Sequence, residues 1–93
     1  MRHQPMIQIE RLDDLHFRVT VNGPSQTTHH QVAVRHEYHN QLVGEQVTPH
    51  NLVEAAFKFL LRKEPNTSIL HGFDLAEVER FFPEFPQEIK DYL

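Results

Sequence analysis

The chain has 93 residues, a formal net charge of −4 at pH 7 and no cysteine. This length fits one small domain, and the missing cysteine excludes a disulfide framework and thiolate chemistry. The acidic balance argues against a nucleic-acid partner, because binding to phosphates needs cations. No apolar run reaches the roughly 20 residues of a membrane span, and the N-terminus lacks a signal-peptide core, so we expect a soluble cytoplasmic protein of bacterial type.

Three segments of the N-terminal half show the alternation of apolar and polar residues that is typical of β-strands. They span residues 6–11, 15–22 and 27–35. Turn-forming residues separate them, namely an Asp-Asp pair at 13–14 and Asn-Gly-Pro-Ser at 22–25. Such short connections predict a three-stranded antiparallel β-meander with one buried face.

A short polar helix is predicted over residues 36–43, where Gly44 closes it. Residues 48–63 predict a longer central helix with Thr48 as its N-cap and Pro49 in its first position, where a missing N–H costs nothing. The polar side chains of this helix form one narrow stripe, made of Asn51, Glu54, Lys58 and Arg62. Its other sides are apolar, so the rest of the chain or a partner has to cover it on several sides.

The C-terminal residues predict shorter helical segments. Asp74 and Glu77 form a capping-box pattern that opens a helix to about Phe82, and the proline that follows stops it. Pro86 can start one or two final turns. The predicted fold is therefore α+β, with a three-stranded antiparallel β-meander, a short helix, a long buried central helix and C-terminal helical segments in one domain over residues 1–93.

The apolar side chains of the strands and of the central helix are expected to form one core. Its predicted members are Leu15, Phe17, Val19, Val21, Val32 and Val34 from the strands and Leu52, Ala56, Phe59 and Leu60 from the helix. Five aromatic residues are expected mainly to cover the other flank of this helix: Phe73, Phe81, Phe82, Phe85 and Tyr92. The alternative is that Phe81, Phe82 and Phe85, in a segment that contains Pro83 and Pro86, form an exposed docking patch for a protein partner.

Histidine is the compositional outlier, with eight residues, of which seven lie in the first fifty positions. His36 and His39 are three residues apart on a predicted helix, so their side chains can share one metal ion. His29 or His30, at the end of the adjoining strand, can add a third ligand to give a three-histidine zinc site with an open position. The alternative is a solvated polar face that becomes basic on mild acidification.

The sequence carries no pattern that predicts catalysis. It has no Gly-x-Ser-x-Gly elbow, no glycine-rich phosphate loop and only three glycines. Its carboxylates are scattered, and Glu77 is better explained as a helix cap than as a general acid. We therefore expect a protein that is not an enzyme and that needs no cofactor.

Residues 27–61 contain an alternating strand (THHQVAVR), a short helix (HEYHNQLVGEQ), a turn and a capped apolar helix. This order resembles the ribbon-helix-helix family of DNA-binding antitoxins and repressors. The resemblance implies a ribbon of two strands, one from each of two chains, that enters the major groove of DNA. It also implies that Gln31, Ala33 and Arg35 read bases or lie next to the readers. Thr48 would then hold a phosphate at the start of the second helix.

The C-terminal half carries a second resemblance. The runs LVEAAFKFLLRKEPNTSIL and FDLAEVERFFPEF resemble small bacterial proteins of no assigned function. That resemblance implies no activity. Because the sequence shows neither a catalytic constellation nor a basic face, and because its apolar helix is larger than a small sheet needs, we expect a protein-interaction module. Its partner would be another protein or a second copy in a homodimer, and the alternatives are a DNA-binding regulator and a histidine-based metal-binding protein.

Overall fold

The computed structural model describes residues 6–93 of the chain. In chain order, its elements are β1 (Met6–Arg11), β2 (His16–Asn22), β3 (Thr27–Ala33), α1 (His36–Leu42), α2 (Pro49–Lys63), a 3₁₀ turn η1 (Asn66–Ser68), β4 (Gly72–Asp74), a 3₁₀ turn η2 (Leu75–Glu77), α3 (Val78–Phe81), α4 (Phe85–Glu88) and a 3₁₀ turn η3 (Ile89–Tyr92). The first three strands and first two helices lie within two residues of their predicted bounds. No helix in the described range is long and apolar enough to cross a membrane.

The strands form one sheet in the order β1-β2-β3-β4. The first three strands pair antiparallel, as predicted, with Ile9 opposite Val19 and Val19 opposite His30. β4 pairs with β3 in parallel, with Phe73 opposite Val32. The prediction of a three-stranded, purely antiparallel sheet is therefore wrong in this respect. Three residues are too few to show alternation, and β4 is separated from its partner strand by α1 and α2 in the sequence.

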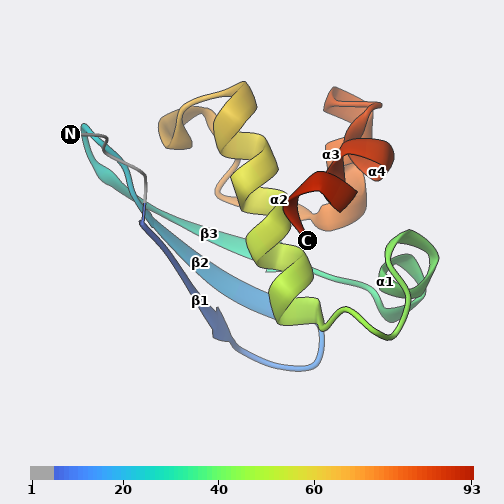
Figure 1. The fold of residues 1–93 in the computed structure, drawn as a ribbon. Helices are drawn as coiled ribbons and strands as arrows, with labels where there is room; N and C mark the ends of the chain where they lie inside the picture. The colour runs from blue at the N-terminus through green and yellow to red at the C-terminus, as the bar shows by residue number, and fades with distance from the viewer. Residues whose placement is uncertain (1–5) are drawn as a thin grey trace.

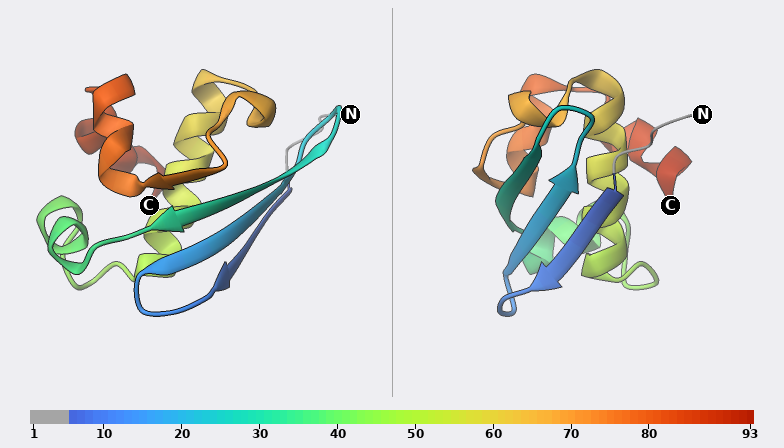
Figure 2. Two further views of the ribbon diagram at one scale, coloured as in Figure 1. Left: turned by 180° about the vertical axis from the view of Figure 1, so that it is seen from behind. Right: turned by 90° about the vertical axis from the view of Figure 1, so that its left-hand side faces the viewer.

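The described residues form two layers, because the helices lie on one face of the sheet and leave the other face open (Figure 1). In the right-hand view of Figure 2 the sheet faces the viewer, and α2 and the C-terminal helices lie behind it. The residues of β2 follow this division, since Phe17, Val19 and Val21 are buried whereas Arg18 is exposed. The helices thus cover the apolar face that the alternating pattern predicts.

α2 lies between the sheet and the C-terminal segments, and both of its ends follow from the sequence. Thr48 is the N-cap, and its hydroxyl oxygen accepts the backbone N–H of Asn51 at 3.1 Å. The polar stripe is exposed at Lys58 and Arg62. The buried side chains of α2 lie on the other sides, and they are Leu52, Val53, Ala55, Ala56, Phe57, Phe59 and Leu60. Glu64 ends the helix as its C-cap.

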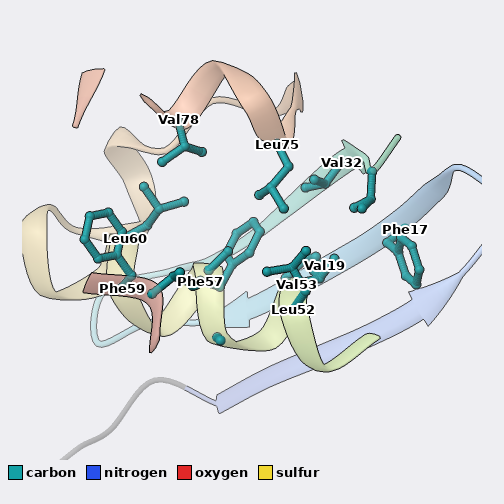
Figure 3. Close-up of a cluster of buried hydrophobic side chains, with 14 of the residues drawn as sticks. Phe17, Val19, Val32, Leu52, Val53, Phe57, Phe59, Leu60, Leu75 and Val78 are labelled. Carbon is teal, nitrogen blue, oxygen red and sulfur yellow. The ribbon is translucent and has the colours of Figure 1, made fainter. Parts of the chain in front are cut away.

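The core joins the sheet, α2 and the C-terminal segments into one cluster (Figure 3). The close-up shows Val19 of the sheet beside Leu52 and Val53 of α2. Nine of the ten predicted core residues are buried. The prediction is wrong for Leu15, which is 44% exposed. This residue lies in the β1–β2 turn, where its N–H donates to Asp13 Oδ1 at 2.8 Å, so the alternation of β2 does not extend to it.

The predicted capping box is confirmed at the start of the η2–α3 segment. Asp74 Oδ1 accepts the N–H of Ala76 at 3.0 Å, and Glu77 Oε2 accepts the N–H of Asp74 at 2.8 Å. The first turn is 3₁₀ rather than α-helical, and α3 continues from Val78 to Phe81. These two hydrogen bonds fix the direction in which the chain leaves β4.

The C-terminal aromatic residues cover the flank of α2 that the sheet leaves uncovered. The Phe59 ring lies 5.1 Å from the ring of Phe85, 5.8 Å from that of Phe82 and 6.2 Å from that of Tyr92, measured between ring centroids. The ammonium group of Lys63 lies 5.1 Å from the centroid of the same ring. These contacts confirm the predicted cover of the central helix for Phe82, Phe85 and Tyr92, whereas Phe81 is 64% exposed and the prediction is wrong for it.

Candidate functional site

A groove of about 350 Å³ lies where the end of α2, the connector to β4 and the η2–α3 segment meet. The end of α2 supplies Leu60 and Glu64, the connector supplies Leu70, and the η2–α3 segment supplies Val78 and Phe81. Its lining is mostly apolar, and its volume is near the lower end of the range of about 300–1,000 Å³ for ligand pockets. It therefore has room for a few apolar side chains of a partner.

Two large apolar side chains of the groove are exposed to solvent. Phe81 is 64% exposed and Leu70 is 50% exposed, and they come from different walls. Phe81 is also the most exposed of the seven phenylalanines. Apolar side chains that gather at a depression mark interaction sites more often than scattered ones do.

The connector wall, residues 65–71, is held on the sheet by polar bonds. The Nδ1–H of His30 donates to the carbonyl of Leu70 at 2.7 Å. On the next residue of β3, the N–H of Gln31 donates to the carbonyl of His71 at 2.7 Å. The left-hand view of Figure 2 shows β4 beside β3, directly after this connector. The groove is therefore a preformed part of the fold.

His30 belongs to a chain of buried hydrogen bonds. Because a carbonyl only accepts, the Nδ1 of His30 carries the proton in its bond to Leu70, and Nε2 accepts the hydroxyl proton of Thr28 at 2.8 Å. The Thr28 oxygen in turn accepts an N–H of Asn66 at 2.9 Å. This arrangement needs the neutral imidazole, and burial lowers the pKa of His30 accordingly.

The free energy of unfolding is expected to fall as the pH drops below about 6.5, the ordinary pKa of histidine. Burial lowers the pKa of His30 in the folded chain, so the unfolded chain takes up this proton first and acid favours unfolding. In His30→Gln the fall between about pH 7 and pH 5 should be less steep, as measured by urea denaturation across this range. His36→Gln is the control, because His36 is exposed. If it changes the pH dependence of the free energy of unfolding as much as His30→Gln does, the dependence does not come from the burial of His30.

Asn66 anchors the start of the connector and is only 3% exposed. Its side-chain amide also donates to the carbonyl of Gln26 at 3.0 Å, in the β2–β3 turn. Gly23 lies directly beside it, since a Cβ at this position would lie 2.3 Å from Asn66 Oδ1. Gly44, by contrast, is the glycine that adopts a positive φ, of 79°. Position 23 therefore requires glycine for space rather than for its backbone conformation.

Glu64 is the groove residue with the least favourable surroundings for a charge. Burial raises the pKa of its carboxyl. It is the C-cap of α2, where the helix dipole disfavours an anion. Within residues 6–93 no cationic side chain lies within 4.0 Å of this carboxylate. The neighbouring Lys63 instead binds Glu84 at 3.2 Å and Glu88 at 3.3 Å.

The three phenylalanines predicted as a docking patch have three different environments. Phe81 is exposed and lines the groove. Phe82 is half-buried and lines it as well. Phe85 is fully buried against Phe59, so the prediction of one exposed patch is wrong for this residue. Phe85 is the first residue of α4, with Pro86 in the first turn, and it is the buried residue of this helix.

The histidines considered as metal ligands do not come together. His29 and His30 are adjacent on β3 and therefore lie on opposite faces of the sheet, with His29 exposed and His30 buried. His39 is buried, and its Nε2–H donates to the carbonyl of Val47, whereas His36 is exposed on α1. Residues 6–93 contain no group of three or more side chains placed to hold a metal ion. A solvated histidine face is likewise wrong for His30 and His39.

The residues assigned by the ribbon-helix-helix resemblance lie in separate settings. Gln31 and Ala33 lie on the open face of the sheet, while the Nε of Arg35 donates to Asp74 Oδ2 at 2.7 Å. The Thr48 hydroxyl is occupied as the cap of α2. β3 is paired with β2 on one edge and, near its end, with β4 on the other. In this fold the strand assigned to an intermolecular ribbon thus lies inside the sheet of a single chain.

The sequence predicts only part of this groove. The capping box located α3 and the aromatic cluster drew attention to Phe81 and Phe82, but neither Leu70 nor Glu64 belongs to a periodic pattern or a motif. The groove depends on β4, which brings the connector against the sheet. Comparison of the chain with models of protein families, with curated proteins and with solved structures finds no match.

Proposed function

We propose that this protein is a small, non-enzymatic interaction module that binds a protein partner through the groove at the end of α2. The observation that carries the proposal is the exposure of Leu70 and Phe81, at 50% and 64%, on two walls of one depression. Pockets with mostly apolar walls and a few polar groups are the usual form of binding sites. In this groove the polar groups are those of Glu64, Ser68 and Glu77.

The exposure of Phe81 is not explained by the position of its helix. α3 is packed on the core through Val78, which is only 4% exposed. Phe82, the residue directly after Phe81, is half-buried. Burying a phenylalanine side chain contributes about 1.5–3 kcal/mol. The free chain lacks this contribution at position 81, and a complex that covers the ring gains it. Large aromatic side chains are also the residues that most often dominate binding energies.

The groove is preformed, which lowers the entropic cost of binding. The capping box of Asp74 and Glu77 fixes one wall, and the hydrogen bonds of His30 and Asn66 fix the connector wall. α2 forms the third wall and is itself buried on two sides. A partner that enters this groove therefore meets ordered side chains and does not have to order a loop.

A photo-reactive benzoylphenylalanine at position 81 is expected to crosslink a discrete partner in cells that express the protein naturally. Its ring would lie in the interface, whereas the same residue at position 12 would not, because Leu12 is 39% exposed but lies in the β1–β2 turn. Gel electrophoresis and mass spectrometry identify the adduct and show whether it is a second copy of the chain. Leu70→Ser in the position-81 protein should remove the adduct. Equal adducts at both positions, or an adduct that survives Leu70→Ser, would refute the proposal.

A further inference from the structure

We infer that the groove binds a peptide segment that carries a lysine or arginine beside an apolar anchor residue, and that Glu64 pairs with this cation. The inference rests on the proposed function, because it names the chemistry of the partner at the same site. The groove combines an apolar lining with a carboxylate, and the partner must complement both features.

Glu64 has no cationic partner among the side chains of residues 6–93. Its carboxylate lies beside apolar groove residues and at the negative end of α2. An anion at this position costs stability in the free protein, so a neutral side chain would suit the isolated fold better. A charged residue that destabilises the free fold and forms no ion pair within it points to an interaction with a binding partner. Here that interaction is with a cation from outside the chain.

The other carboxylate of the groove that the capping box contains, Glu77, and the lysine next to Glu64, Lys63, already have partners. The Glu77 carboxylate accepts the N–H of Asp74 at 2.8 Å, as part of the capping box. Lys63 is bound by Glu84 and Glu88 on the flank of α2 that faces the last helical turns. Glu77 is itself an anion, and Lys63 cannot pair with Glu64 without giving up its bonds to Glu84 and Glu88. A basic side chain of a partner is therefore the complement that the groove lacks.

Two other occupants conflict with the charges of the groove. In a symmetric homodimer built groove to groove, Glu64 and Glu77 of one copy would face the same two carboxylates of the other, and like charges oppose such contacts. An anionic amphiphile such as a fatty acid would meet the same repulsion. A peptide with an aliphatic or aromatic side chain and a neighbouring lysine or arginine avoids both conflicts.

The inference is tested with a phage-displayed library of random twelve-residue peptides, selected on the immobilised 93-residue protein. Selections run in parallel on Glu64→Gln, on the groove variant Leu70→Ser/Phe81→Ser, and on Glu54→Gln. The last variant is the matched control, because Glu54 lies on the polar stripe of α2 and does not line the groove. We expect peptides enriched on the wild-type protein and on Glu54→Gln to pair an apolar residue with a lysine or arginine at constant spacing.

On Glu64→Gln the apolar preference should remain and the basic preference should disappear. The most enriched peptide, synthesised with a fluorescent label, should bind Glu64→Gln about tenfold more weakly in an anisotropy titration, as expected for losing a charge-assisted hydrogen bond. The thermal melting point of Glu64→Gln should be equal to or above that of the wild type. This result separates a role in binding from a role in folding.

The outcomes distinguish the inference from the proposed function. Enriched peptides that bind the groove without a basic residue, or that bind Glu64→Gln as tightly as wild type, would overturn the inference and leave the groove as a docking site. Peptides that bind the double groove variant as well as they bind the wild type, or no enrichment on the wild type, would overturn both.

Discussion

Replacing Phe59 with alanine is expected to lower the free energy of unfolding by about 3–5 kcal/mol. The ring is fully buried in α2, and it contacts the rings of Phe82, Phe85 and Tyr92. Alanine would remove this buried apolar surface and leave a cavity between α2 and the C-terminal helices, which can collapse only in part. Chemical denaturation with urea, followed by circular dichroism, gives the difference directly.

Phe81→Ala is the matched control for this experiment. It deletes the same side chain from a position that is 64% exposed, so we expect a loss within about 0.5 kcal/mol. Phe81 also lies in the groove, and its variant should therefore lose binding while it keeps stability. A loss below about 1 kcal/mol for Phe59→Ala would show that the C-terminal segments do not pack on α2 as described.

Asn66→Ala is expected to cost about 2–4 kcal/mol, because it leaves buried acceptors without donors. The Asn66 amide donates to the carbonyl of Gln26 and to the hydroxyl oxygen of Thr28, at 3.0 and 2.9 Å. Alanine supplies neither bond, and the connector wall loses its anchor on the β2–β3 turn. Urea denaturation measures the cost, and Thr67→Ala at the exposed neighbouring position is the control. A cost for Asn66→Ala that does not exceed the control would refute the anchor role.

The same site allows a double-mutant cycle with Gly23. A Cβ at position 23 would overlap Asn66 Oδ1, so Gly23→Ala should destabilise the wild type by about 1–3 kcal/mol. In the Asn66→Ala background the space is free, and Gly23→Ala should have little further effect. The resulting coupling energy reports the contact between the two residues. Simple additivity of the two losses would contradict the close approach that defines this turn.

The sequence was sufficient to predict the elements whose residues repeat with a clear period. β2 and β3 alternate, and α2 combines a capping threonine, a proline in its first turn and one narrow polar stripe. Each of these features involves residues that are close in sequence, so it can be recognised without knowledge of the fold. The same holds for the capping box at Asp74, which needs only a residue and its neighbour three positions on.

The rest of the fold depends on contacts between residues that are distant in sequence. β4 consists of three residues, and it becomes a strand only because β3 offers a parallel edge. His30 has a polar side chain, which by itself favours exposure to solvent. It is buried because the carbonyl of Leu70 and the hydroxyl of Thr28 form hydrogen bonds with its two ring nitrogens. Leu15 continues an alternating pattern, yet the turn at Asp13 places it in solvent. The first two outcomes have no signature within the local sequence, whereas Leu15 is the site of two conflicting local signals, the alternation of β2 and the turn at Asp13.

The candidate site was predictable only in part, for the same reason. Phe81 and Phe82 were identified from their aromatic character, whereas Phe85 has the same character and is buried. Glu64 is one of thirteen acidic residues, and nothing in the sequence separates it from the others. Glu64 belongs to the groove because the end of α2 places it beside residues of the connector and of α3, which come later in the sequence.

The parallel strand β4 also determines when during synthesis the groove can exist. Every residue that lines the groove follows Phe59, whereas β1, β2, β3 and most of α2 precede it. As the chain leaves the ribosome, the antiparallel strands can pair first, because their contacts are local. The groove can form only after α3 has been made and β4 has joined the sheet. A partner that recognises the groove therefore meets chains that have been synthesised at least as far as Phe82, and it does not capture shorter ones.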